Sequence, residues 1–299
     1  MSNINIPASI TTGYTHCGVF HADETMATAM LRILYPDMKV VRVAFAPKDI
    51  RDDEIVYDIG NGEYDHHLGD KARKNGVPYA ACGLIWRDFG PSILKKLDAS
   101  VEAMGQIDGI ICQPIDLRDN RGSQRPKDVP MMELSDCIAA LNPTWEEDAA
   151  YTEAAFNEAV EFCTKILLRQ IERVKSSFKA AEVVKHAIEN TTDGIMHLER
   201  FVPWQSHLIN SENPKAESIL FVTYPSLRGG YNAQSVPMGN TRENKLLFPA
   251  TWHGKSGEEL IQLTGVADAV FCHKAGFLVS AKTLEGVTQL AKTAIAASN

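Results

Sequence analysis

The stretch HCGVFHADE, residues 16–24, decides the fold prediction for this chain. A strand-like run at residues 14–20 leads into it, and from Asp23 apolar residues recur at helical spacing until a proline at position 36. This pattern predicts a strand, a turn and a helix in that order. The polar side chains of His16, His21 and Asp23 would then lie where the strand ends and the helix begins.

The rest of the first third continues to alternate strand-like runs with helical patterns. Residues 39–45 and 54–59 predict strands, residues 78–89 predict a helix that Gly90-Pro91 ends, and residues 92–112 predict another helix. Alternation of this kind is typical of an α/β fold with a parallel sheet flanked by helices. Open sheets of this type bind ligands at the carboxyl ends of their strands.

Three more groups of His and Asp residues follow such element ends. They are Asp58 after the third strand, Asp65-His66-His67 after a glycine turn, and Asp116 with Asp119 after an apolar run. Imidazole and carboxylate without thiolate suit Mn²⁺, Co²⁺ or Zn²⁺ better than an all-oxygen Mg²⁺ site. Taken singly, Asp23 could be only a helix N-cap. The four groups together favour two metal ions, which a carboxylate can bridge.

The composition is that of an ordinary globular protein. The chain has 299 residues, of which 44% are hydrophobic and 23% charged, and a net charge of −8. This length predicts about two domains. No apolar run is long enough for a membrane helix, and the first residues lack the features of a signal peptide. Six scattered cysteines without a CxxC pair argue against a disulfide framework. We therefore expect a cytoplasmic protein with buried, reduced thiols.

Charge and periodicity divide the chain into three parts. Residues 1–143 carry 15 Lys/Arg and 20 Asp/Glu, a net charge of −5, whereas residues 191–299 carry nine of each. Residues 144–190 contain no Gly or Pro, and Thr144 can cap a long helix there. We predict a metal-binding domain at 1–143, a helical linker at 144–190 and a smaller mixed α/β domain at 191–299. In the last part, strands are expected in 219–224, 231–236 and 269–278, and a helix from residue 283.

The DHH string at 65–67, together with Asp58 and the first stretch, resembles the DHH phosphoesterase superfamily. Within it, the H-x-G-x-F-H-x-D-E motif is similar to that of the Myg (melanocyte proliferating gene) family. The resemblance implies a metal-dependent hydrolase with its active site in the cleft between two domains. It also implies 3′-5′ exonuclease activity on RNA or short oligonucleotides. Four further stretches carry the match: YDHH, PYAACGLIWRDFG at 78–90, NAQSVP at 232–237 and FCHKAGFLVSAKTLEGV at 271–287.

The resemblance further implies a role for each site residue. One metal would bind to His16, His21 and Asp58, and the other to Asp23, Asp58, His66 and Asp119, so that Asp58 bridges them. Mn²⁺ is the expected ion, with Mg²⁺, Co²⁺ and Zn²⁺ as alternatives. His67 would contact the phosphate, and Asp65 would orient the histidines. Substrate-binding residues in the C-terminal domain would be Arg228, Gln234, His273, Gly276, Ser280 and Lys282.

Two departures from the family pattern leave alternatives open. The usual D-N-G reads Asp119-Asn120-Arg121-Gly122 here, so Asp116 is a rival ligand. The usual F-I-G-G reads FLVS at 277–280, and without its glycines the backbone approaches a phosphate less closely. One alternative is a small-molecule phosphoesterase or pyrophosphatase, which the lack of a basic stripe favours. Another is a non-catalytic metal-containing binding protein. A monomer and a homo-oligomer are both compatible with the sequence.

Overall fold

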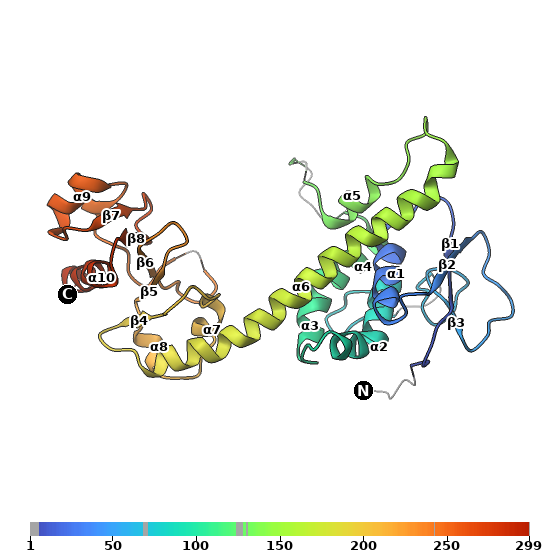
Figure 1. Cartoon of the computed structure of the whole chain (residues 1–299), viewed down its shortest axis with the longest axis horizontal. Coiled ribbons are helices and arrows are strands. Elements are labelled where there is room, and N and C mark those ends of the chain that lie inside the picture. The colour runs from blue at the N-terminus through green and yellow to red at the C-terminus, as the bar shows by residue number, and fades with distance from the viewer. Residues whose placement is uncertain (1–5, 68–70, 124–127, 130, 242, 299) are drawn as a thin grey trace. The chain divides into compact units, whose positions relative to one another are not determined.

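The chain forms two compact units, Met1–Lys175 and Ser176–Asn299, each with its own sheet (Figure 1). A computed structural model describes residues 6–67, 71–123, 128–129, 131–241 and 243–298. Unit 1 contains a parallel three-stranded sheet with helices, and unit 2 contains a mixed five-stranded sheet. The predicted α/β class is therefore confirmed.

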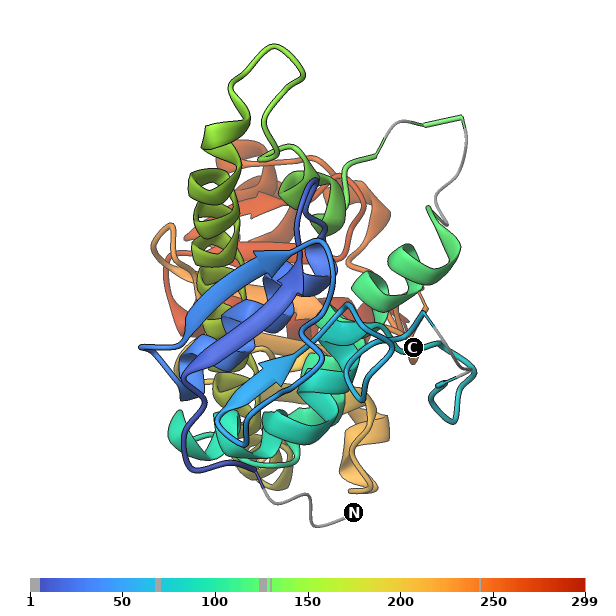
Figure 2. The ribbon, with the colours of Figure 1, turned by 90° about the vertical axis from the view of Figure 1, so that its right-hand side faces the viewer.

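The sheet of unit 1 consists of β1 (Thr12–His16), β2 (Lys39–Val43) and β3 (Glu54–Val56), in the order β2-β1-β3. All pairs are parallel, and Tyr14 lies opposite both Val41 and Val56. Figure 2 shows the three strands side by side. Because β2 follows β1 on one side and the chain then continues to β3 on the other side, the carboxyl ends of β1 and β3 border a crevice.

Helix α1 (Ala22–Leu34) follows β1, and its buried face includes Met26 and Met30. Helix α2 (Ala81–Lys96) runs through Gly90-Pro91, so the prediction that these residues end it is wrong. Burial of Phe89 and Ile93 on either side of the proline compensates for the missing hydrogen bond. The next elements are α3 (Ala103–Ile107), a π-helical turn (Asp108–Cys112), α4 (Gln113–Arg121) and α5 (Leu134–Ala139). Asp116 and Asp119 thus lie on a helix.

Helix α6 (Thr152–Glu189) has 38 residues and begins after a 3₁₀ turn at Ala149–Tyr151, eight residues later than the predicted cap at Thr144. Its apolar stripe is buried as the periodicity predicts, for example at Phe156, Val160 and Cys163. In the part of the chain that is described, no helix combines the length and hydropathy needed to cross a membrane. All six cysteines are free, but Cys17 is exposed, so the expectation of buried thiols fails there.

The sheet of unit 2 has the order β4-β5-β6-β8-β7, with β4 and β5 parallel and the other pairs antiparallel. Helix α10 packs on one face, where Val287 and Leu290 join a core with Phe221 and Val279. A second core on α6 includes Val184 and Trp204. The elements are β4 (Ile195–His197), α7 (Gln205–Ile209), α8 (Lys215–Ser218), β5 (Phe221–Pro225), β6 (Tyr231–Ser235), a 3₁₀ turn (Ala250–Trp252), α9 (Gly257–Thr264), β7 (Ala269–Cys272), β8 (Leu278–Ala281) and α10 (Leu284–Ser298).

The single strand predicted at 269–278 is a hairpin. Strands β7 and β8 pair antiparallel across a turn in which His273 N–H donates to Leu278 O and Gly276 N–H donates to His273 O. Gly276 has φ of 67°, and a Cβ there would lie 2.1 Å from His253 Nε2. The glycine is therefore required by the turn and by the packed histidine ring.

Candidate metal centre

A cavity of about 720 Å³ lies at the carboxyl edge of the sheet of unit 1. His16 is the last residue of β1, Asp58 follows β3 by two residues, and His21 precedes α1. The parallel strands therefore bring side chains that are far apart in sequence to one place. The titratable residues that line the cavity are His16, His21, Asp23, Asp58, Asp65, His67, Arg118, Asp119 and Asp136.

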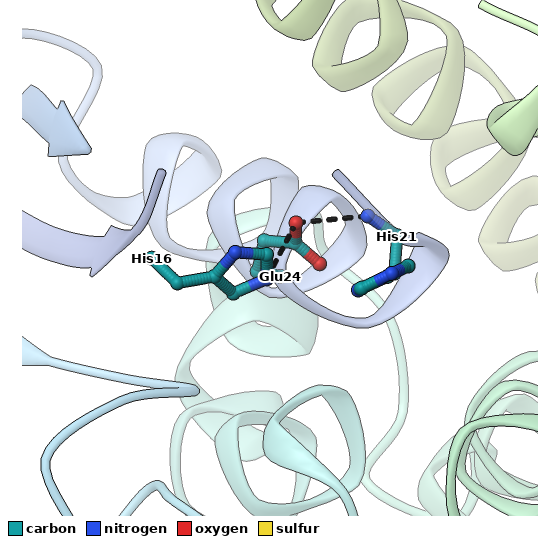
Figure 3. Close-up of side chains that lie close together, drawn as sticks. All are labelled: His16, His21 and Glu24. Carbon is teal, nitrogen blue, oxygen red and sulfur yellow. Dashed lines mark hydrogen bonds and ion pairs between the residues drawn. The ribbon is translucent and has the colours of Figure 1, made fainter. Parts of the chain in front are cut away.

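Glu24 connects the two histidines of the first motif. Its Oε1 accepts the backbone N–H of His21 at 2.8 Å and lies 3.0 Å from Nε2 of His16 (Figure 3). The two imidazole rings are 5.4 Å apart between centroids. Glu24 is fully buried and belongs to neither of the predicted ligand sets. A carboxylate in the first turn of a helix is expected for the helix dipole alone, so only the contact with His16 distinguishes it.

Asp58 lies between the two groups of ligand candidates. Its Oδ2 is 3.4 Å from His16 Nε2, and its Oδ1 is 3.5 Å from His66 Nε2. Asp119 approaches His66 from α4, with Oδ2 3.0 Å from the same Nε2. The backbone of Asp58 has φ of 56°, a left-handed conformation that Asp and Asn adopt more readily than most residues. The turn out of β3 thus directs this carboxylate into the cavity.

Asp23 is fully buried and also holds the start of α2. Its Oδ2 accepts the N–H of Ala81 at 2.8 Å, and its Oδ1 accepts the N–H of Cys82 at 2.7 Å. Ala80, the residue at the cap position of α2, has no side chain that could bind these donors. The sequence offered Asp23 as the N-cap of its own helix, but His21 holds that position, and Asp23 instead binds the first N–H groups of α2. This role is compatible with the ligand role, since each carboxylate oxygen has a second lone pair.

The charged groups of the cavity shift one another's pKa values. Burial lowers the pKa of His16, but the contacts with the carboxylates of Asp58 and Glu24 outweigh it and raise the value to about 11. The carboxylates of Asp119 and Asp58 raise the pKa of His66 to about 11. Burial would raise the pKa of Asp58, yet the two imidazoles hold it below its usual value. Burial and the charge of Asp58 raise the pKa of Asp23 well above its usual range.

Three buried atoms at this place fit a cation. Oε2 of Glu24, Oδ1 of Asp58 and Nε2 of His66 make no hydrogen bond of normal geometry within the described residues, although Nε2 of His66 lies 3.0 Å from Asp119 and 3.5 Å from Asp58. A buried polar atom without a hydrogen bond is costly. Among the described residues, four groups have potential ligand atoms that lie within 4.8 Å of one another: His16, His21 and Glu24; Asp58, His66 and His67; Asp23, His66 and Asp119; and Asp23, Cys82 and Asp116. These residues fit the hard and borderline divalent ions that bind imidazole and carboxylate.

His67 lies at the edge of this group. Its side chain is 60% exposed, and its Nδ1 is 2.5 Å from Oδ1 of the buried Asp65. Asp65 also accepts the N–H of Asn61 at 2.6 Å, so the carboxylate is held by the glycine turn. The structure thus pairs Asp65 with His67, which is the arrangement expected for an orienting carboxylate.

The rival ligand Asp116 lies within 4.8 Å of Asp23, measured between their potential ligand atoms, but behind the cavity wall. Its Oδ2 is 2.7 Å from Nη2 of Arg73, and its Oδ1 accepts the N–H of Gly83 at 3.0 Å. Arg73 in turn donates to both oxygens of Asp108. Burial raises the pKa of Asp116 to about 7, although Arg73 opposes the shift. Asp116 does not appear among the described residues that line the cavity, whereas Asp119 does.

One of the cavities in unit 2, with a volume of about 610 Å³, brings together three of the predicted substrate-binding residues, Arg228, His273 and Ser280. Gln234 lies outside it, where its Oε1 accepts the hydroxyl of Tyr224 at 2.6 Å. Gly276 and Lys282 do not line the cavity either, as far as the described residues show. The carboxyl ends of β4 and β5 and the turns around them supply the aromatic walls, Phe201 and Tyr224.

Comparison with known proteins identifies a family. The model of the MYG1 exonuclease family, described as "Uncharacterised protein family (UPF0160)", matches residues 13–295. The chain is 29% identical to human MYG1 exonuclease over 94% of its length and 85% of that protein. It is 30% identical to bovine MYG1 exonuclease, over 94% and 84% of the two chains, and 29% identical to the MYG1 protein of Saccharomyces cerevisiae, over 94% and 95%. No solved structure matches the chain. Because the family model covers nearly all of the sequence, the chain belongs to the MYG1 exonuclease family.

Proposed function

We propose that this protein is a metal-dependent phosphoesterase of the DHH type, a 3′-5′ exonuclease that acts on RNA or short oligonucleotides. The observation that carries the proposal is the set of buried atoms of Glu24, Asp58 and His66 that lie at one sheet edge without a hydrogen bond of normal geometry. The names of the human and bovine relatives, both MYG1 exonucleases, support a nuclease.

We assign His16, His21 and Asp58 to one ion and Asp23, Asp58, His66 and Asp119 to the other, with Mn²⁺ as the preferred metal. Asp58 is the bridging residue, because its two oxygens face His16 and His66 separately. A pair of divalent ions supplies positive charge to the attacking and leaving oxygens of a phosphoryl displacement. Glu24 positions His16 and His21, since its Oε1 contacts both residues.

His67 is the residue of unit 1 that we assign to the substrate phosphate. Nδ1 of His67 is hydrogen-bonded to Asp65, so Nε2 is the ring nitrogen that can bind a phosphate oxygen. Asp65 therefore fixes the orientation of the ring, while the exposed position of His67 in the cavity wall leaves it accessible to substrate.

The sheet face of unit 2 favours a nucleotide over pyrophosphate. Tyr224, Asn232, Ser280 and Phe271 lie opposite one another on β5, β6, β8 and β7, and all four line the cavity that contains Arg228. Aromatic rings beside amide and hydroxyl groups form a surface on which bases can stack. Pyrophosphate, a phosphoanhydride, and small phosphoesters without a base have no ring that could stack on such a surface.

The test is release of mononucleotides from a short RNA labelled at its 5′ end, with and without Mn²⁺. We expect Mn²⁺-dependent shortening from the 3′ end, and no activity in Asp58→Asn. DNA of the same sequence and pyrophosphate serve as competing substrates. Faster hydrolysis of pyrophosphate than of RNA would support the small-molecule alternative. Binding of RNA without hydrolysis under all metal conditions would support a binding protein, and either result would refute the proposal.

A further inference from the structure

The cavity of the metal centre contains a positively charged side chain that is not among the proposed metal ligands. Five carboxylates line it, those of Asp23, Asp58, Asp65, Asp119 and Asp136, and Arg118 is the one Lys or Arg among its described lining residues. A guanidinium stays protonated at any physiological pH, whereas the histidines of the cavity can lose their proton. Arg118 is therefore the fixed positive charge of this cavity.

The helix that carries Asp119 places Arg118 on the same face. Ile115, Arg118 and Asp119 occupy positions i, i+3 and i+4 of α4, and all three line the cavity. Residues at this spacing are neighbours on one side of a helix. Asp119 Oδ2 lies 3.0 Å from His66 Nε2, so the guanidinium belongs to the same wall as a ligand candidate.

Asp136 of α5 accepts a hydrogen bond from the guanidinium of Arg118, and this contact occupies one of its N–H donors. Nη2 of Arg118 donates to Oδ1 of Asp136 at 3.2 Å, the one side-chain contact recorded for Arg118 among the described residues. Asp136 is itself fixed, because its Oδ2 accepts the N–H of Glu133 at the start of α5. An arginine has five N–H donors, and the side chain of Arg118 is 30% exposed. Several donors can therefore reach a ligand in the cavity.

We propose that Arg118 binds the non-bridging oxygens of the phosphoryl group that is cleaved, and that Asp136 positions it for this contact. Planar guanidinium groups bind phosphate oxygens through two parallel N–H donors. Negative charge on these oxygens increases during displacement, so Arg118 contributes both to binding and to rate. This inference rests on the proposed phosphoesterase function and adds a substrate contact from unit 1 to it.

A purely structural reading is that Arg118 and Asp136 only join α4 to α5. A partly exposed ion pair of this kind contributes little to stability. The two readings differ in their effect on phosphate. A structural pair would change unfolding and leave phosphate affinity alone, whereas a substrate contact would change phosphate affinity at unchanged metal content.

The experiment compares Arg118→Gln, Arg118→Lys and wild type as full chains loaded with Mn²⁺. Binding of inorganic phosphate is measured by calorimetry, bound metal by elemental analysis, and RNA hydrolysis by kcat/KM. The matched control is Arg121→Gln, which removes the same charge one turn along α4, at a residue that donates to Gly76 O and is not part of the cavity lining. Loss of one charge-assisted contact should weaken phosphate binding about tenfold or more in Arg118→Gln. Arg118→Lys should lie between it and wild type, and Arg121→Gln should match wild type.

Phosphate affinity of Arg118→Gln within twofold of wild type would overturn the proposal, as would an equal loss in Arg121→Gln. Loss of Mn²⁺ from Arg118→Gln would also overturn it, because the residue would then act on the metal ligands. If Arg118→Gln does not fold, wild-type phosphate affinity in Arg118→Lys would favour the structural reading. Arg118-dependent phosphate binding without hydrolysis in the wild type would refute the proposed function, while the contact between Arg118 and phosphate would stand.

Discussion

Replacement of Asp23 by alanine should destabilise unit 1 even when no metal is bound. The side chain is fully buried, and its two oxygens accept the N–H groups of Ala81 and Cys82 at 2.8 and 2.7 Å. Each buried N–H left without a partner costs about 1–3 kcal/mol. Relief of the repulsion between Asp23 and the carboxylates of Asp58, Asp116 and Asp119 offsets part of this cost. We expect a net loss of about 2–3 kcal/mol.

Hydrogen exchange of the peptide that contains Ala81 and Cys82 measures this loss directly in chelator-treated protein. A loss of this size corresponds to exchange that is roughly 30- to 150-fold faster at these amides. Asp58→Asn is the matched control, because Asp58 accepts no recorded backbone N–H within the described chain, and it should leave exchange in α2 unchanged. Wild-type exchange and wild-type urea stability in Asp23→Ala would refute the assignment of Asp23 as the cap of α2.

Three further results are expected. Asp58→Asn keeps a residue that tolerates the left-handed backbone. The variant should nevertheless lose most of its bound Mn²⁺, as measured by elemental analysis. Two retained ions per chain would contradict a bridging role for Asp58. His67→Ala should retain metal and lose on the order of 10²-fold in kcat, whereas full activity would make His67 only a turn residue. The pKa values of about 11 keep the rings of His16 and His66 charged at neutral pH, so Mn²⁺ must displace a proton from each ring. The affinity of the protein for Mn²⁺ should therefore rise with pH toward pH 11. Calorimetry in buffers of different ionisation enthalpy measures the released protons, and binding without proton release would show that these rings are not ligands.

The same histidine pairs set the pH dependence of the metal-free fold. A folded-state pKa above the unfolded value means that the charged pairs of His16 and His66 stabilise the fold fully below about pH 6.5. This contribution decreases as the pH rises and is lost near pH 11. Metal-free protein should therefore lose stability with rising pH over the range in which metal binding becomes stronger.

The sequence predicted the parallel sheet and the residues at its edge because strand ends and polar clusters coincide in this chain. It could not predict contacts that depend on three-dimensional packing. In the sequence Glu24 is an ordinary carboxylate in the first turn of a helix, and only its 3.0 Å contact with His16 indicates its role in the site. Arg118 and Asp136 are 18 residues apart on two short helices, and no periodicity connects them. The assigned metal and substrate roles themselves remain predictions.

The boundaries that failed have a common cause. Gly90-Pro91 usually ends a helix, but here the helix continues and Gly90 is packed closely, since a Cβ would lie 2.7 Å from Met104 Sδ and 3.1 Å from Trp86 Cδ2. In the same way, the turn between β7 and β8 depends on Gly276 and the ring of His253, which lies 23 residues earlier in the sequence. Tertiary packing decides both cases, and local sequence patterns carry no information about it.

The left-handed backbone of Asp58 has a consequence for mutational tolerance. With φ of 56°, position 58 accepts Gly, Asn and Asp at low cost and strains β-branched or bulky side chains. A library of all twenty residues at this position would therefore give two different rankings. Scored for protein abundance, Asn and Gly should survive while Glu is depleted, although Glu keeps the charge. Scored for metal-dependent activity, only Asp should survive. Glu conserves the charge of Asp58 but not its backbone conformation, whereas Asn conserves the backbone conformation but not the charge.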